Sequence, residues 1–344
     1  MRGGFMTVDA PAQAIASGPF RALWSHMRLL TFATALLVLQ QPDVDAAIRD
    51  FDARRYAEAR PVFAAAAKSD PRASLYLGRL ELLEGDAGAA TKWLEQAVQR
   101  APKSAEAERW LGRAYARQAR RANKFRQASL AGRVRGAFEA AVRLDPKNVE
   151  ARRDLMQYYL VAPRIVGGGK DKAQAQARAI AALNPMYGRL ATAWIAEASG
   201  DVAGAEREVA ATHAAWPDST EPTLALGAMQ QRAKQWDAAT ATYRALLART
   251  PSVREAWYQR GRVVAESGTR DASALVDGAA ALERFIGTPP GEEDAPLASA
   301  WLRLGMVRER QGDAARARAA FQQALKLDPE LDDARKGLDR VGKR

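Results

Sequence analysis

The sequence predicts an all-α solenoid of about eight helix–turn–helix hairpins, wound into a right-handed superhelix and covered at its end by a C-terminal capping helix. Three observations predict this architecture. Small and apolar residues recur at helical spacing along most of the chain. Prolines follow these segments at regular intervals, and one undisturbed period of 34 residues runs from Pro217 to Pro251. Aromatic residues make up only 7% of the 344 residues, which suits helices that pack through small side chains.

The clearest repeating unit covers residues 297–333 and predicts two antiparallel helices. The residues at helical spacing are Trp301, Leu304 and Gly305 in the first helix and Ala317, Phe321 and Ala324 in the second. Gly305 and Ala317 are small enough for the two helices to approach closely, while Trp301 and Phe321 fill the space between them. Pro329 has no backbone N–H to donate and ends the second helix. A polar segment, residues 331–341, follows as the predicted capping helix.

The same anchors recur in the preceding units. The small residue of the second helix recurs as Ala59, Ala90, Ala173, Ala205 and Ala239, and the terminating proline as Pro71, Pro102, Pro146, Pro185, Pro217, Pro251 and Pro290. The glycine of the first helix recurs as Gly78, Gly112, Gly227 and Gly261. Extra residues lengthen three units, and we expect loops or extended helices there. They lie near 118–130, at 162–169, and in the unit from Pro251 to Pro290 together with the segment 291–296 after it.

These spacings resemble the tetratricopeptide repeat, in which W-x2-L-G is followed by A-x3-F-x2-A and a proline. The resemblance covers residues 42–344. Within it, YYLVAP and GGGKDKA between positions 158 and 173 are similar to a group of exported bacterial repeat proteins whose biochemical activity is uncharacterised. The resemblance implies a non-catalytic scaffold whose first helices line a concave groove for a protein or peptide.

Residues 1–41 are predicted to be a leader with a signal peptide. Arg21 and Arg28 precede an apolar run at 29–39, which is too short to span a bilayer and suits a signal-peptide core. Val44 and Ala46 are small residues suited to a cleavage site, and translation from Met27 would give a signal of ordinary length. The alternative is a hydrophobic first helix that covers the array. We therefore expect an exported, periplasmic protein without a transmembrane helix in the mature chain.

The sequence offers little material for catalysis, cofactors or metals. The chain has no cysteine and two histidines, His26 and His213, and neither histidine belongs to a metal-binding motif. The GGGK at 167–170 lacks the spacing of a phosphate-binding loop, because Arg164 stands where its first glycine is required. We expect a flexible turn there. Paired carboxylates such as Glu292 and Glu293 stand in a predicted loop, where we expect them to be solvated. We therefore expect the chain not to be an enzyme.

The strongest signal outside the core is basic. The net charge is +12, and residues 109–138 contain no acidic residue. Arg109, Arg113 and Arg117 follow one another at intervals of four, so they line one face of a helix. The groove candidates by this register are Arg79, Arg109, Arg113, Arg117, Arg153, Gln157, Tyr258 and Arg262. A solvated, merely arginine-rich face is the alternative.

The predicted function is therefore the binding of a peptide or protein partner in the groove, by exposed guanidinium groups that attract an acidic segment. A basic surface that binds a polyanion, either anionic lipid or nucleic acid, is the alternative function. Nucleic acid is the less favoured polyanion, because only Tyr115 and Phe125 interleave the basic run and offer base stacking.

Overall fold

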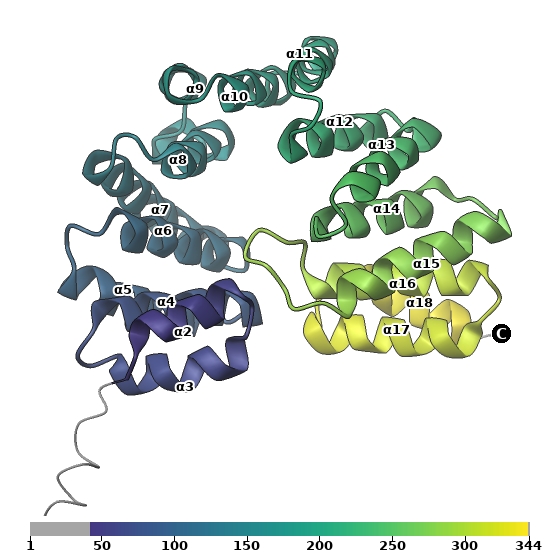
Figure 1. The fold of residues 1–344 in the computed structure, drawn as a ribbon, viewed down its shortest axis with the longest axis horizontal. Coiled ribbons are helices and arrows are strands. Elements are labelled where there is room, and N and C mark those ends of the chain that lie inside the picture. The colour runs from purple at the N-terminus through teal and green to yellow at the C-terminus, as the bar shows by residue number, and fades with distance from the viewer. Residues whose placement is uncertain (1–41, 343–344) are drawn as a thin grey trace, which may run out of the picture. The chain divides into compact units, whose positions relative to one another are not determined.

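The computed structural model describes residues 42–342, and the predicted leader at 1–41 lies outside them. The chain divides into two units, Met1–Asp43 and Val44–Arg344, and the fold below is that of the second. The described residues form 17 α-helices and one short 3-10 helix, and none of them lies in a strand (Figure 1). This confirms the all-α prediction.

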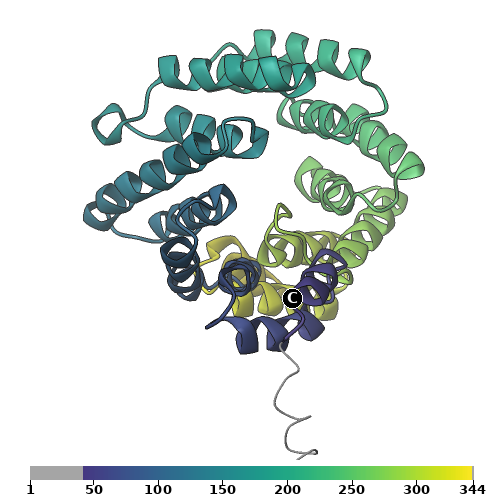
Figure 2. The ribbon, with the colours of Figure 1, turned by 60° about the vertical axis from the view of Figure 1, so that its left-hand side comes forward.

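The helices pair into eight hairpins, followed by one last helix. The first helices are α2 (Val44–Asp52), α4 (Pro71–Glu84), α6 (Ala105–Arg120), α8 (Val149–Val161), α10 (Pro185–Ala198), α12 (Thr220–Arg232), α14 (Arg254–Ser267) and α16 (Leu297–Arg310). The second helices are α3 (Tyr56–Ala66), α5 (Ala87–Arg100), α7 (Lys124–Leu144), α9 (Lys170–Leu183), α11 (Val202–Ala215), α13 (Trp236–Arg249), α15 (Ala272–Ile286) and α17 (Ala314–Leu327). Each helix packs on the next in the chain, so the hairpins follow one another in sequence order (Figure 2).

A close approach between glycine and a large side chain closes five of the hairpins. A Cβ atom added to the first-helix glycine would come within 2.3–2.5 Å of the second-helix side chain, so only glycine fits at these crossings. The pairs are Gly78 with Leu94, Gly112 with Phe138, Gly227 with Tyr243, Gly261 with Leu282 and Gly305 with Phe321. The structure thus adds Phe138 and Leu282 to the anchors that the sequence identified.

The last helix, α18 (Asp332–Gly342), covers the final hairpin as the sequence predicted. Phe321 is completely buried, and a Cβ atom at Gly337 of α18 would lie 2.5 Å from its ring. Ala334, Gly337 and Val341 are the buried residues of α18, and Leu338 is half-buried. Phe321 therefore joins α16, α17 and α18 into one apolar cluster.

The three longer units have different structures. The extra residues of the third hairpin lengthen α7 to 21 residues. Those of the fourth form the 3-10 helix η1 (Arg164–Val166), and those after α15 form a loop at 287–296 without helix. At the other end of the unit, α2 begins at Val44, so the predicted cleavage site at Val44 and Ala46 overlaps the first helix.

Candidate functional site

Three first helices, α4, α6 and α8, hold most of the arginines that the sequence identified (Figure 1). Each helix begins at a side chain that accepts a backbone N–H: Asp70 before α4, Ser104 before α6 and Asn148 before α8. These caps fix where each helix starts. They therefore fix which residues point toward the neighbouring first helix.

Trp110 of α6 lies at the centre of the arginines. Its ring is 5% exposed, and three guanidinium carbons lie near its centroid: Arg79 at 5.0 Å, Arg109 at 5.5 Å and Arg113 at 4.9 Å. A cation beside an indole ring is stabilised by the negative face of the ring. Arg79 also lies 4.6 Å from the ring centre of Phe51. Trp110 thus stabilises three guanidinium groups that lie close to one another.

Asp154 of α8 neutralises two of these charges. Its Oδ2 accepts from Arg109 Nε at 2.8 Å and from Arg113 Nε at 2.7 Å, and its Oδ1 accepts from Arg113 Nη2 at 2.9 Å. The side chains of Arg109, Arg113 and Asp154 are 13%, 20% and 11% exposed. Burial lowers the pKa of Arg113, but Asp154 and Glu293 together raise it by more, so the net pKa is raised.

Arg79 of α4 pairs with an acid that lies far away in the sequence. It donates from Nε to Glu292 Oε1 at 2.7 Å and from Nη2 to Glu292 Oε2 at 2.6 Å, in a bidentate pair, and its Nη1 lies 3.0 Å from Glu106 of α6. Arg79 is 8% exposed. Burial opposes the charge on Arg79, but Glu292 and Glu106 raise its pKa.

Glu292 belongs to the loop at 287–296, which we call the acidic loop. This loop leaves α15 and reaches the first three hairpins (Figure 1). Its Glu293 pairs with Arg113, its Pro290 carbonyl accepts from Tyr56 Oη at 2.6 Å, and its Pro289 carbonyl accepts from Arg54 Nη1 at 3.1 Å. At its other end, Asp294 pairs with Arg254 of α14. The acidic loop therefore joins the beginning and the end of the described unit.

These contacts correct two expectations. We expected the arginines to be exposed and without a nearby acid, but Arg79, Arg109 and Arg113 are largely buried and paired. The acids come from α8 and from the acidic loop, outside the acid-free run that the sequence shows. We also expected Glu292 and Glu293 to be solvated. That is wrong for Glu292, which is 18% exposed, and correct for Glu293, which is 71% exposed.

Comparisons with known proteins agree with this fold. Family models described as tetratricopeptide repeat match residues 44–105 and 298–331. Yeast Tom70 superimposes with a TM-score of 0.64 over 89% of this chain and 64% of that chain, at 13% identity. The chain contains tetratricopeptide repeats.

Two bacterial proteins also resemble it. Cellulose synthase operon protein C of Pseudomonas fluorescens (strain SBW25) is 33% identical over 147 residues, which are 42% of this chain and 11% of that protein. A tetratricopeptide repeat protein from Parabacteroides merdae ATCC 43184 covers 79% of this chain and 98% of its own, at 15% identity and a TM-score of 0.45. This chain thus spans about a tenth of the length of its curated relative.

The other predicted groove residues of the repeat array have mixed environments. Arg153 lies 5.1 Å from the ring centre of Tyr187 and 5.3 Å from that of Trp194, and its buried Nε has no hydrogen-bond partner. Gln157 is exposed. Tyr258 is 5% exposed and packs against Phe285, so its ring is part of the core. Arg262 pairs with Glu266 at 2.8 Å. Of these four residues, Gln157 is exposed, Arg153 and Arg262 are half-buried and Tyr258 is buried.

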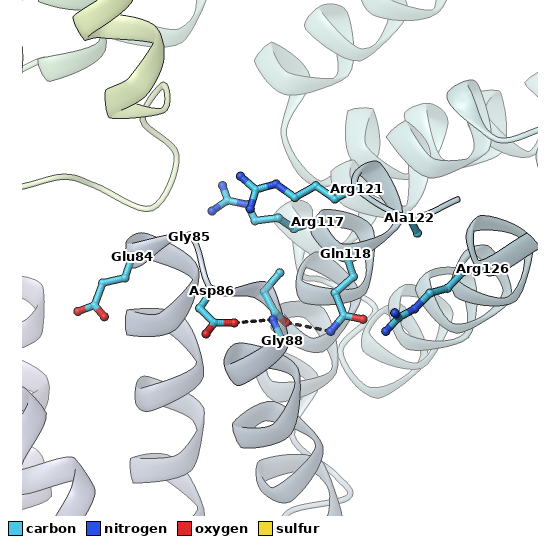
Figure 3. A pocket seen from close by; sticks show the side chains of 10 residues that line it. Glu84, Gly85, Asp86, Gly88, Arg117, Gln118, Arg121, Ala122 and Arg126 are labelled. Atoms are coloured by element: carbon cyan, nitrogen blue, oxygen red, sulfur yellow. Dashed lines mark hydrogen bonds between the residues drawn. The ribbon is translucent and has the colours of Figure 1, made fainter. Parts of the chain in front are cut away.

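The last turn of α6 and the start of α7 hold cations of a different kind. Arg117 donates to the carbonyl of Leu82, and burial together with Arg120, Arg121 and Arg113 lowers its pKa. No ion pair involves Arg117, Arg120, Arg121, Lys124 or Arg126 within residues 42–342. Arg117, Arg121 and Arg126 line a cavity of about 530 Å³ between the second and third hairpins, together with Gln118 (Figure 3).

The remaining features of the described part of the array are its potential metal ligands, its most apolar helices, His213 and the GGGK segment. No group of three or more potential metal ligands occurs there, and no helix there is long and apolar enough to cross a membrane. His213 Nδ1 lies 3.3 Å from the hydroxyl of Thr223. The GGGK segment lies between η1 and α9, as we expected. Within this turn, Gly167 N donates to Arg164 O and Gly169 N donates to Tyr159 O.

Proposed function

We propose that this chain is a non-catalytic scaffold for protein–protein interaction, and that it binds an acidic peptide or protein segment in a groove lined by α4, α6 and α8. The repeat architecture supports binding of this kind, because a solenoid offers a long surface whose side chains are fixed before the partner arrives. The observation that carries the proposal is the acidic loop. It places an extended acidic segment on arginines that the sequence selected as carboxylate-binding residues.

The geometry explains why a carboxylate would bind here. Guanidinium groups bind carboxylates through two parallel hydrogen bonds, as Arg79 does with Glu292. Trp110 and Asp154 hold the guanidinium groups in place, so little side-chain entropy is lost when a partner binds. A partner carboxylate therefore competes with Glu292 and Glu293, and Arg153 and Gln157 lie further along the same first-helix face.

The test uses the acidic loop itself as the probe. A fluorescent peptide with the loop sequence GTPPGEEDAP and its diamide form GTPPGQQDAP are titrated with the protein. The Glu292→Gln/Glu293→Gln variant loses the competing carboxylates. We expect it to bind the acidic peptide about tenfold more tightly than the wild type does, because a tethered competitor acts at a high effective concentration. The diamide peptide should bind neither form.

Two further variants serve as controls. Glu58→Gln/Glu330→Gln removes the same charge at two exposed glutamates without ion pairs, and it should leave the affinity at the wild-type value. Adding Arg113→Gln to the Glu292→Gln/Glu293→Gln variant should remove most of the gain. Equal affinity of the wild type and the loop variant for the acidic peptide would reject the acidic-segment site. With cell extract, a protein that the loop variant retains and the acidic peptide releases is the expected partner.

We further propose that the chain is exported and acts in the bacterial cell envelope. The support is the apolar run at 29–39 with arginines before it, and the similarity to exported repeat proteins. N-terminal sequencing of the protein from fractionated cells should show a new N-terminus in the periplasm. An intact N-terminus in the cytosolic fraction would contradict export.

A further inference from the structure

Two neighbouring connections of the array expose large apolar side chains. Phe125, at the start of α7, is 91% exposed, and Ile165 of η1 is 94% exposed. Val161, at the end of α8, is 81% exposed. The other exposed large hydrophobic residues in the described part of the chain are 40–62% exposed. The three most exposed apolar side chains thus belong to the lengthened third and fourth hairpins.

These side chains stand on ordered backbone. The Asn123 side chain accepts from Arg126 N at 3.0 Å and starts α7 directly beside Phe125. In the α8–α9 connection, Gly167 N donates to Arg164 O at 2.9 Å and Gly169 N donates to Tyr159 O at 2.9 Å. A Cβ atom at Gly168 would lie 1.8 Å from Ala162 O, so this tight turn requires glycine. The fold therefore positions Phe125 and Ile165 outward.

The two connections lie on the same side of the array. Both join a first helix to its second helix, in consecutive hairpins, and both lie at the left-hand edge in Figure 2. The Val166 carbonyl accepts from Arg135 Nη1 of α7 at 3.3 Å, so η1 packs against α7. Arg135 is ten residues along α7 from Phe125, which is about 15 Å at the helical rise. Phe125 and Ile165 are thus separate tips and do not form one continuous patch.

Cations without an ion pair lie on either side of Phe125 along the chain. Arg117, Arg120, Arg121, Lys124 and Arg126 have no ion pair within the described residues, and no acid occurs between positions 109 and 138.

The cavity beside the start of α7 is lined by three of these arginines, Arg117, Arg121 and Arg126 (Figure 3). Two acids also line the cavity, but both are engaged. Glu84 pairs with Arg60 at 2.6 Å and turns away from the arginines, and Asp86 Oδ1 accepts two backbone N–H groups of α5. The cavity therefore presents cationic groups to a ligand.

We propose that this edge, formed by the start of α7 and by η1, docks on an anionic membrane surface. Phe125 and Ile165 would enter the interfacial region, while the arginines would contact lipid phosphates, with one headgroup in the cavity. Separate apolar tips surrounded by cations suit a fluid lipid surface, whereas a protein partner would require a continuous complementary patch. A single exposed aromatic side chain offers no series of stacking platforms for nucleic acid. This surface is distinct from the proposed peptide groove.

Vesicle co-sedimentation tests the proposal. The probes are vesicles of two parts phosphatidylcholine to one part phosphatidylglycerol, and vesicles of phosphatidylcholine alone. We expect the wild type to bind only the anionic vesicles. Lys124→Glu/Arg126→Glu and Phe125→Ser should each weaken this binding by about tenfold or more, because charge attraction and apolar insertion both contribute.

Matched controls separate the edge from general charge and hydrophobicity. Arg318→Glu/Lys326→Glu reverses two exposed cations of α17 that have no ion pair, and Val276→Ser removes a side chain that is 62% exposed on α15. Both controls should bind like the wild type. The proposal would be overturned by no binding to anionic vesicles, by equal losses in edge and control variants, or by full binding of Phe125→Ser. Equal affinity for a single-stranded oligonucleotide would overturn it too.

The absence of cysteine allows a direct measurement of insertion. Single variants Phe125→Cys, Ile165→Cys and Val276→Cys are each labelled with an environment-sensitive dye. With anionic vesicles, the dyes at positions 125 and 165 should shift to shorter emission wavelengths, and the dye at position 276 should not. A shift at all three positions, or at none, would contradict docking through this edge.

Discussion

The helix α6 and the residues after it hold arginines in two opposite environments. Arg109 and Arg113 are mostly buried beside Trp110 and are paired with Asp154. Arg117 and Arg121, one and two turns further on, have no ion pair within residues 42–342. The pKa values differ in direction as well. Asp154 and Glu293 together outweigh burial and raise the pKa of Arg113, whereas burial and the neighbouring arginines lower the pKa of Arg117.

This difference shows that one basic helix can serve two purposes. In the paired half, Arg109 and Arg113 pack between α6, α8 and the acidic loop, and the carboxylates of Asp154 and Glu293 already balance their charge. In the open half, which Arg117 and Arg121 form, like charges lie close together and no ion pair within residues 42–342 engages them. An added anion would therefore relieve their repulsion. A regular spacing of arginines in a sequence therefore does not reveal which of them can receive a partner.

The largest expected effect follows from removing the carboxylate that Arg109 and Arg113 share. Asp154→Ala leaves Arg109 and Arg113 without their shared carboxylate, and breaking a buried pair from one side is strongly destabilising. We expect the free energy of unfolding in urea to fall by about 4 kcal/mol. Asp218→Ala is the control, because Asp218 is 95% exposed in its pair with Arg249, and it should lose at most about 1 kcal/mol. Equal losses would show that Asp154 is not a structural partner.

The second prediction compares the same substitution in the two halves. Arg113→Glu places a carboxylate beside Asp154 and Glu293, so we expect the free energy of unfolding to fall by about 3 kcal/mol. Arg121→Glu changes an exposed residue without an ion pair, and its effect should stay within about 0.5 kcal/mol. Thermal unfolding followed by circular dichroism measures both. A reversal of this order would mean that the two environments are assigned wrongly.

The fold was predictable because its anchors follow local rules. Small residues and prolines at fixed intervals predict hairpins, and the structure confirms eight of them and the covering helix α18. Gly112 illustrates the limit of this prediction. Its partner Phe138 stands four residues after Val134, at a place where units such as the last one have alanine. The extra residues in α7 also change the distance in sequence between Gly112 and Phe138. The sequence therefore predicted the hairpin but missed the side chain that closes it.

The site was harder to predict because its acids come from distant positions. Glu292 lies 213 residues from Arg79, and no periodicity relates a loop to the helix that it contacts. The ten extra residues after α15 and the acidic run at 292–294 were visible in the sequence, but only the return of the loop to the first hairpins gives them a role. Asp154 was visible too, one position after Arg153. Its partners depend on the distance between α6 and α8, which the repeat pattern does not specify.

The third prediction separates the two glutamates of the acidic loop. Glu292 is 18% exposed and makes a bidentate pair with Arg79, whereas Glu293 is 71% exposed. We expect Glu292→Gln to destabilise the unit by about 2 kcal/mol, since hydrogen bonds between charged groups contribute about that much. Glu293→Gln should lose about 0.5 kcal/mol, as exposed ion pairs do. Hydrogen exchange should show faster exchange in α4 for Glu292→Gln only, and equal exchange in both variants would contradict the ranking.

The last prediction concerns Glu255, a partly buried carboxylate that forms no ion pair within residues 42–342. Glu255 in the first turn of α14 accepts from Gln259 Nε2 at 2.6 Å and from Ala295 N of the acidic loop at 3.4 Å. Burial raises its pKa from the ordinary 4.5 to about 6, although these two hydrogen bonds oppose the change. Asp154, by contrast, has two arginines. Glu255 should therefore favour the folded state when protonated and disfavour it when charged.

The sign of the pH dependence follows from this raised pKa. Since the folded state holds the proton more tightly, the contribution of Glu255 is most favourable below its ordinary pKa of 4.5 and is lost as the pH rises through about 6. Glu255→Gln cannot lose a proton. It should therefore gain stability over the wild type as the pH rises across this window, by up to about 2 kcal/mol. Urea unfolding of both forms on either side of the window measures this difference. A constant difference would show that Glu255 titrates normally and that the acidic loop does not shield it from water.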